Sequence, residues 1–429
     1  MISGANTQTQ TSTTHHTAII PFYSYAALCF LISTVFLLIN ISDFSGHYFQ
    51  PKVLAVTHLM ALGWGTMMIL GASHQLIPVL IEETLYSTKL AYLCFLLAAI
   101  GIPLLIFGFY NFNLGAAAKT GGVLINLSIL VFIVNITKSF STNKKENIHA
   151  LFIFTASIWL LLTTSIGLLL LFNFTENLLP QSSLHYLSLH AHFGIAGWFL
   201  LLIVGVGSRL IPMFMISKYN SLKLLKTIYY LINFGLISFV ISFQFPNSFP
   251  AFIPVIIISS GITCFVIYCR NAYLQRIRKK VDSPVKLSLL SLLMVILPIL
   301  ILLMVIIFSI NSTNQKMVMA YGFCIFFGWI TSIILGMTFK TLPFIVWNKA
   351  YKSNAVKGKN LDPKNLFSIK IFNAMAVAYI IGFLIFLSGI ISSKILLLQT
   401  GSVLLLITAV LYNLNIIKLI THKVKPNGS

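Results

Sequence analysis

The chain has 429 residues, of which 58% are hydrophobic and 8% are charged, and its mean hydropathy is +0.95. This balance excludes an ordinary soluble domain, in which about a quarter of the residues are charged. The formal net charge of +21 does not indicate nucleic-acid binding, because basic loops in a membrane protein set its topology and contact anionic lipid. We therefore expect membrane lipid, and no nucleic acid, as a partner.

Taken in chain order, the sequence begins with a polar segment and continues as a series of long apolar runs. Residues 1–17 are rich in Thr, Gln and Ser and carry no basic region before an apolar one, which predicts a disordered cytoplasmic tail rather than a signal peptide. Residues 18–417 predict a single membrane domain, with helices long enough to cross ~30 Å of hydrocarbon. We predict twelve helices, at 18–42, 53–80, 88–111, 121–138, 150–173, 187–216, 224–243, 250–270, 286–309, 317–346, 369–389 and 395–417. A basic cytoplasmic tail, 418–429, completes the chain.

One pattern, G-W-x6-G-x6-P, occurs three times in these predicted helices. It begins at Gly63, Gly197 and Gly328, so consecutive copies are 134 (197 − 63) and 131 (328 − 197) residues apart. Three of the five tryptophans hold the same place in it. Such internal repetition indicates a repeated architecture. Because the copies fall in the second, sixth and tenth helices, we predict an all-α, polytopic membrane fold of three four-helix repeats around an approximate threefold axis.

The placement of basic residues predicts the orientation of the chain. With twelve spans, both termini lie on one side of the membrane, and that side holds 24 of the 28 Lys and Arg residues. The other side holds the remaining four, Lys52, Lys119, Lys316 and Lys394. An excess of Lys and Arg marks the cytoplasmic loops. We predict a multi-pass protein of a bacterial-type inner (plasma) membrane, with both termini in the cytoplasm.

Histidines mark the candidate site. A histidine stands six residues before the repeated Trp in two copies, at His58 and His192, and Phe323 replaces it in the third. Ionisable groups within the membrane are usually functional, and neutral imidazole is a common ligand of copper and haem iron. We therefore expect His58 and His192 to bind a metal ion or haem. The alternative is that both histidines only hydrogen-bond to neighbouring helices.

His190 adds an ambiguity, because it lies two residues before His192. Side chains two apart on an ideal helix point about 200° from each other. Either one imidazole faces the site and the other the extracytoplasmic loops, or the start of the helix is irregular there. We favour His192, which holds the repeat position, and His190 stays open as the ligand. His74 follows His58 by about 24 Å along the same helix, and we expect a surface or interface histidine there.

Other polar groups inside the predicted helices are few. Every Asp and Glu falls in a loop or at a helix end, which argues against proton-coupled transport, because transporters normally carry carboxylates within the membrane. Lys340 lies near the cytoplasmic end of the tenth helix and is expected to extend its amino group to the interface. The five cysteines show no CxxC spacing and are expected to pack as small apolar residues.

The architecture and the histidines resemble subunit I of the haem-copper oxidase superfamily. The run 189–198, followed by Gly205 and the segment 210–214, is similar to the single-subunit, oxidase-like branch, which includes the NnrS-type haem- and copper-containing membrane proteins linked to nitric oxide stress. In that superfamily the second span supplies a ligand of the low-spin haem, and the sixth span supplies a copper ligand. The resemblance therefore implies haem b, copper or both, at His58 and at His190 or His192.

One departure from the family limits the activity that the resemblance implies. Oxidases carry haem-ligating histidines on the tenth span and an adjacent copper-ligating pair after the seventh, whereas here the spans from the seventh to the twelfth hold no histidine. Met319, Tyr321 and Met337 are the remaining candidates in the tenth span, and such residues more often only pack. We expect a haem- or copper-binding protein of respiration or nitric oxide stress. If it is an enzyme, it is an oxidoreductase other than a complete terminal oxidase. The alternatives are a cofactor-free carrier or channel, or a structural partner subunit.

Overall fold

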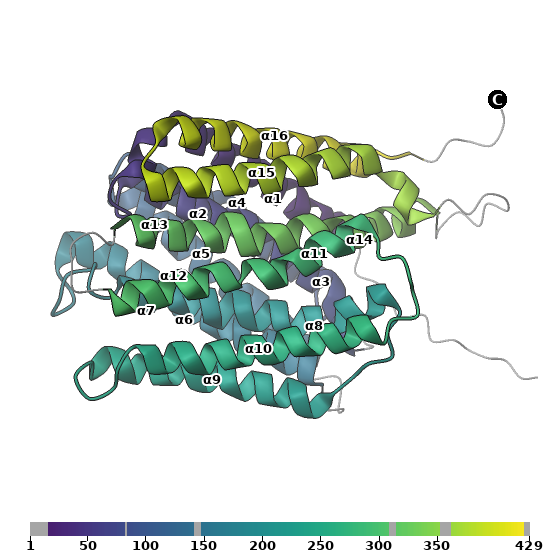
Figure 1. Ribbon diagram of the computed structural model, residues 1–429, viewed down its shortest axis with the longest axis horizontal. Helices are drawn as coiled ribbons and strands as arrows, with labels where there is room; N and C mark the ends of the chain where they lie inside the picture. Colours follow the sequence, from purple (N-terminus) through teal and green to yellow (C-terminus); the bar gives the residue numbers. More distant parts are fainter. Residues whose placement is uncertain (1–15, 82–83, 141–146, 309–314, 352–361, 424–429) are drawn as a thin grey trace, which may run out of the picture.

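The fold is an all-α membrane bundle. The computed structural model describes residues 16–81, 84–140, 147–308, 315–351 and 362–423. Within these ranges it has twelve helices long and apolar enough to cross a membrane, packed side by side along the long axis of the molecule (Figure 1). The predicted tail 1–17 lies outside the described residues except for His16 and Thr17, which already belong to the first helix. Half of the predicted tail 418–429, residues 424–429, lies outside them as well, and residues 418–420 belong to the last helix.

The observed spans differ from the predicted ones by no more than five residues at either end. The first five spans are α1 (His16–Ile39), α2–η2–α3 (Pro51–His58, Leu59–Thr66, Met67–Ile81), α4 (Thr88–Tyr110), α5 (Ala116–Phe140) and α6 (Ile148–Glu176). The sixth to ninth spans are α7–η3–α8 (Leu187–His192, Phe193–Leu200, Leu201–Met215), α9 (Leu222–Gln244), α10 (Phe252–Leu274) and α11–α12 (Ser283–Met294, Ile296–Ile307). The last three are α13–η5–α14 (Gln315–Phe323, Cys324–Ile330, Thr331–Tyr351), α15 (Ile369–Ser392) and α16 (Ile395–Ile420), and two short 3-10 turns, η1 (Ile41–Ser45) and η6 (Pro363–Leu366), lie between spans.

Local sequence fixes where several of these helices begin. Ser87, Ser221 and Ser368 each stand before an apolar run, and each hydroxyl accepts a hydrogen bond from the backbone N–H three residues later. Asn147 caps α6 in the same way, through two backbone N–H groups. Such caps satisfy donors that the first helical turn leaves without partners. The boundaries predicted from hydropathy are therefore accurate here because polar caps flank the apolar runs.

The repeated Gly-Trp phrase has one local conformation in all three copies. The Gly-Trp pair that begins each copy lies in a π-helical segment, η2, η3 or η5. Downstream of the Trp, Gly71, Gly205 and Gly336 face the preceding span so closely that a Cβ there would lie within about 3 Å of Phe22, Phe152 and Ser288, respectively. Glycine is required at these places because backbones pass next to neighbouring side chains. The spans that carry the phrase are also the most deeply packed, each with 78% of its apolar window buried.

Two hydrogen bonds donated by tryptophan side chains connect these spans. Trp64 Nε1 donates to Thr331 Oγ1 over 3.1 Å, and Trp198 Nε1 donates to Thr66 Oγ1 over 3.0 Å. Both threonines stand two residues after a repeated Trp, and Leu200 holds the third such place. The threefold relation of the four-helix units stays a prediction. In an experimental structure, we expect the three tryptophans of the pattern at similar depth, and a spread above about 11 Å, two helical turns, would contradict it.

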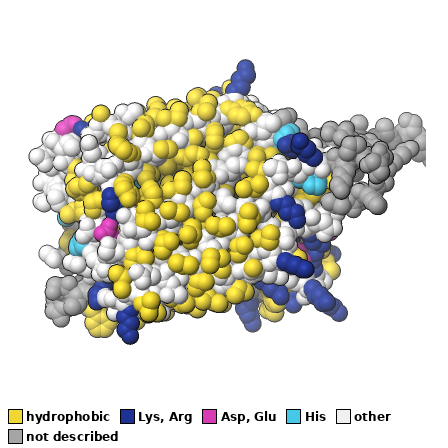
Figure 2. Space-filling model, turned by 90° about the horizontal axis from the view of Figure 1, so that it is seen from above, with side chains coloured by type: hydrophobic (Ala, Val, Ile, Leu, Met, Phe, Trp, Pro, Cys, Tyr) yellow, Lys and Arg dark blue, Asp and Glu magenta, His cyan; other side chains and the backbone are white. Residues whose placement is uncertain are grey.

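The two ends of the bundle differ in charge. We define the distal end as the end where α2, α7 and α13 begin, on the left in Figure 1. Figure 2 shows a hydrophobic band across the middle of the visible face, and on that face more Lys and Arg at the opposite end than at the distal end. This distribution is typical of a membrane protein whose distal end faces away from the cytoplasm.

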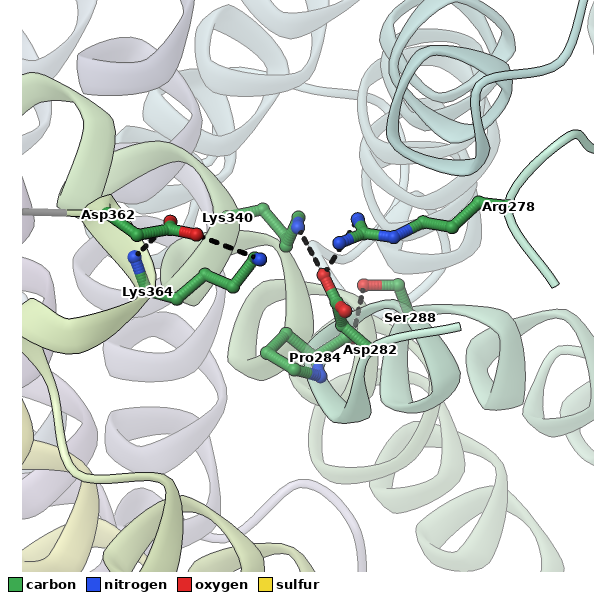
Figure 3. A network of polar contacts seen from close by, with 7 residues as sticks. All are labelled: Arg278, Asp282, Pro284, Ser288, Lys340, Asp362 and Lys364. Carbon is green, nitrogen blue, oxygen red and sulfur yellow. Dashed lines mark hydrogen bonds and ion pairs between the residues drawn. The ribbon is translucent and has the colours of Figure 1, made fainter. Parts of the chain in front are cut away.

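Ion pairs at the basic end correct the expectation for Lys340. Its side chain is only 12% exposed, and its amino group lies 2.9 Å from an Asp282 carboxylate oxygen, which also lies 3.1 Å from Arg278 (Figure 3). The amino group therefore pairs with Asp282 at the end of the ninth span instead of extending freely to water. Nearby, hydrogen bonds from the Lys364 backbone N–H and from its ammonium group lower the pKa of Asp362.

The orientation can be tested by labelling with a membrane-impermeant maleimide. Asn177 follows α6 at the distal end, and Arg278 precedes α11 at the basic end. We expect the Asn177→Cys variant to be labelled in intact cells, and the Arg278→Cys variant to be labelled only after permeabilisation. Labelling of both cysteines from the same side would show that the predicted topology is wrong.

Candidate functional site

The candidate site begins with His58 at the last position of α2, just before the π-helical segment η2. Its Nδ1 lies 2.8 Å from the carbonyl oxygen of Leu54, one turn earlier. Its ring stacks on Phe109 of α4, with 4.3 Å between the ring centroids and 27° between the planes. The carbonyl and the phenyl ring together hold the imidazole in one orientation.

His190 on α7 is held in a similar way by α6. Its Nδ1 lies 2.9 Å from the carbonyl oxygen of Thr163. Its ring passes so close to Gly167 that a Cβ at that position would lie 2.7 Å from the His190 Cε1. The rings of His58 and His190 face each other with 6.1 Å between centroids and 21° between planes. The structure thus brings together two of the three predicted site histidines.

The hydrogen bonds decide which nitrogen of each ring carries a proton. A backbone carbonyl oxygen can only accept, so Nδ1 of His58 and Nδ1 of His190 each donate an N–H. In a neutral imidazole, the other nitrogen, Nε2, then keeps its lone pair. Metal-binding histidines are usually oriented by the same kind of bond between the second ring nitrogen and a carbonyl or carboxylate. Both side chains therefore have the tautomer, with the proton on Nδ1, that leaves Nε2 as the nitrogen with a lone pair.

His192, the histidine favoured from the repeat position, faces other helices. Its Nδ1 lies 2.8 Å from the Ser188 carbonyl oxygen, and its Nε2 lies 3.2 Å from the Tyr321 hydroxyl of α13. Because His190 and His192 are two residues apart, they point to opposite sides of α7. The expectation that His58 and His192 face a common site is therefore not met, and neither imidazole of α7 points to the loops.

His74 is not a surface residue. It is fully buried, its Nδ1 lies 2.8 Å from the Leu70 carbonyl oxygen, and its ring packs between Phe22 of α1 and Phe132 of α5, at 5.5 and 5.2 Å between centroids. The prediction considered only its distance along the helix. The second span is surrounded by its neighbours over most of its length, so a residue near its end is still covered.

A larger ligand set is not found around these histidines. Among the described residues, no group of three or more His, Cys, Asp or Glu side chains is arranged to hold a metal ion. The cysteines are free, and four of them are buried, as expected for packing residues. A structural zinc site, which takes four such ligands, therefore does not fit this part of the chain. The His58–His190 pair is the best-prepared candidate site.

A large cavity lies beside His192. Its volume is about 510 Å³, and it is bounded by α7, η3, α9, α10, the ninth span and the tenth span. The described residues that line it include no Lys, Arg, Asp or Glu. Sequence reasoning missed this cavity, and it also missed Thr163, Gly167 and Phe109, which orient the histidine pair. None of these three belongs to the repeated phrase.

The fold defines the class of this molecule as a multi-pass, all-α integral membrane protein with twelve candidate spans. Its distal end holds a pair of half-buried histidines whose rings are nearly parallel. A scan against protein-family models found no match, and no curated protein matched the chain.

Proposed function

We propose that this protein is an integral membrane copper protein, in which His58 and His190 bind one ion near the distal end. The observation that carries the proposal is the facing pair of rings, 6.1 Å apart between centroids, with both Nδ1 atoms bonded to carbonyl oxygens. Two metal–nitrogen bonds of about 2 Å each, together with the radii of the two rings, span about 6 Å. The centroid separation therefore matches the size of one ion with two imidazole ligands. Because each Nε2 lone pair lies in the plane of its own ring, the stacked rings have to turn for both nitrogens to point at that ion.

The ligand chemistry favours copper over other metals. Imidazole nitrogen suits copper, zinc, iron and nickel, whereas magnesium, calcium and manganese prefer oxygen ligands. Zinc sites in proteins take three or four protein ligands, and the pair offers two. Monovalent copper accepts two nitrogen ligands, so it matches this ligand number. Bound copper would supply one-electron chemistry, and the protein residues would fix its position and exclude water.

Haem is the other cofactor that the family resemblance implies. It fits less well than copper, both at the histidine pair and in the cavity beside His192. Beside the histidine pair, Phe109 covers one face of His58 and the α6 backbone at Gly167 abuts His190. Beside His192, the cavity is large, but none of its described lining residues is a cation that would pair with the haem propionates. Buried carboxylates without partners are strongly disfavoured. Copper is therefore the cofactor that we propose.

The physiological setting that we propose follows from the same resemblance. Similarity to subunit I of the haem-copper oxidases and to the NnrS-type proteins suggests respiration or the response to nitric oxide, in a bacterial-type inner membrane. With both termini in the cytoplasm, the copper site would lie near the extracytoplasmic face. The lack of histidine in the tenth span supports a role other than that of a complete terminal oxidase.

The copper site can be tested with purified protein in detergent. We expect the reduced protein, titrated with Cu(I) against a chromogenic chelator, to bind one ion per chain. His58→Ala and His190→Ala should each weaken binding by at least about tenfold, because loss of a ligand costs more than the 10- to 100-fold typical of its outer-shell partners. His192→Ala is the matched control, since it removes an imidazole from the same helix, and it should keep the affinity.

Three results would contradict the proposal. Equal copper affinity in the wild type and in both His58→Ala and His190→Ala would place the metal elsewhere. A b-type Soret band lost in His58→Ala, without copper, would make haem the cofactor. Protein that binds neither group would instead be a cofactor-free carrier, channel or partner subunit.

A further inference from the structure

The cavity beside His192 lies on the opposite side of α7 from the histidine pair, and the copper proposal does not use it. Its volume of about 510 Å³ is within the range of small-molecule sites, roughly 300 to 1,000 Å³. Along the tenth span it extends from Tyr321 to Trp329, eight residues or about 12 Å of helix. It is therefore large enough for an organic ligand with an extended shape.

Most polar side chains of the cavity lie near its distal end, namely His185, Ser188, His192, Ser242 and Tyr321. The inner part of the described lining is mainly apolar and includes Leu200, Leu236 and Trp329, with the Ser259 hydroxyl of α10 as its one serine. Two copies of the repeated pattern have a threonine two residues after the Trp, Thr66 and Thr331. The copy that lines the cavity has Leu200 there and so offers no hydroxyl. A matching ligand has a polar head and an apolar tail.

The lack of Lys, Arg, Asp and Glu among the described lining residues favours a ligand with a neutral polar head group. Among the described lining residues there is no Lys or Arg to receive a carboxylate or phosphate, and no Asp or Glu to receive an amine. Moving a charged group into such a site without a partner is costly. Fatty acids and phospholipid headgroups are therefore poor ligands, whereas a neutral carbonyl or hydroxyl group can bond to His192 and Tyr321.

The ninth span forms the wall of the cavity toward the lipid. This span is interrupted at Val295, between α11 and α12, as expected from Pro298, whose ring clashes with the carbonyl three to four residues earlier. Val295 and Pro298 both line the cavity. In α12 only Pro298 and Ile301 are buried, so most of this helix is turned outward, toward lipid. A lipid-soluble molecule at this surface is separated from the cavity by this interrupted span.

We propose that this cavity binds a lipid-soluble quinone, with its ring beside His192 and Tyr321 and its tail toward Trp329. The Tyr321 hydroxyl and His192 Nε2 are 3.2 Å apart, a long hydrogen bond that a ligand can replace. A quinone carbonyl accepts from the tyrosine hydroxyl, and a hydroquinone hydroxyl donates to the imidazole nitrogen. The quinone and the hydroquinone are both neutral, which suits a described lining without Lys, Arg, Asp or Glu.

Binding of decylubiquinone to the purified protein in detergent micelles tests the proposal. We expect saturable binding to the wild type and about tenfold weaker binding to Tyr321→Phe, because one hydrogen bond is lost without a change in ring volume. Ala196→Phe, which fills the cavity, should remove saturable binding. Tyr86→Phe is the matched control, since Tyr86 is 57% exposed and far from the lining, and it should bind like the wild type.

Two outcomes would overturn the assignment. Unchanged affinity in Tyr321→Phe would show that the quinone ring does not bind at this pair, and this variant decides the matter if Ala196→Phe fails to fold. Palmitate that competes as well as the quinone would show that the site does not select a neutral head. Copper binding is expected to be equal in Tyr321→Phe and the wild type, so a failure of one proposal leaves the other standing.

Discussion

Replacing Gly167 by alanine is expected to weaken copper binding roughly 10- to 100-fold, although His58 and His190 both remain in the chain. A Cβ at position 167 would lie 2.7 Å from Cε1 and 3.1 Å from Nδ1 of His190. The imidazole must then move, which breaks its hydrogen bond to the Thr163 carbonyl. Loss of such an orienting partner typically weakens metal binding 10- to 100-fold. We expect a loss in this range in the chelator titration.

The control for this substitution is Gly322→Ala. A Cβ at Gly322 would meet nothing within 4 Å, so this variant makes the same chemical change without a steric consequence. An alanine within a helix stabilises it by roughly 0.5–1 kcal/mol relative to glycine, and Gly322→Ala is expected to keep both its fold and its copper. Normal copper affinity in Gly167→Ala would mean that the orientation of His190 does not matter for the metal.

Replacing Gly336 by valine is expected to have the largest effect on stability. A Cβ there would lie 2.5 Å from the Pro284 carbonyl oxygen and 2.7 Å from the Ser288 backbone nitrogen. Because these are backbone atoms of α11, no side-chain rotation relieves the clash, and the tenth and ninth spans must separate. Overpacking costs about 1–3 kcal/mol, and more where the backbone has to shift. We expect a loss of roughly 3 kcal/mol or more.

Thermal unfolding in detergent, followed by tryptophan fluorescence, measures this loss. Gly322→Ala again provides the control, because it lies on the same span in open space. A melting temperature for Gly336→Val close to that of the wild type would show that the ninth and tenth spans are not packed as closely as described. A variant that loses copper affinity but keeps its melting temperature would contradict the expectation as well. Gly336 lies on α14, away from the helix segments that carry the histidine pair.

The helices were predictable because hydropathy is a local property. Each span is fixed by its own run of apolar side chains, whatever its neighbours are, and polar caps such as Ser87 and Ser221 mark where helices begin. The Gly-Trp phrase was visible in the same way, and its copies share a π-helical conformation. The repeat pattern also drew attention to histidines of the second and sixth spans, but it paired His58 with His192, whereas the ring nearest His58 is that of His190.

Only the tertiary structure decided which histidines meet. The repeat position favoured His192, but the rotation of α7 against α6 turns His190 toward His58 and His192 toward Tyr321. That rotation depends on Gly167, whose missing side chain admits the His190 ring, and a single sequence does not show which helices touch. The cavity was invisible for the same reason, because its wall combines five spans and the break at Val295. The amino-acid sequence by itself determined the membrane helices, since burial in lipid depends on each segment alone. Packing between segments decided the site, since the direction of a side chain has meaning only relative to a neighbour.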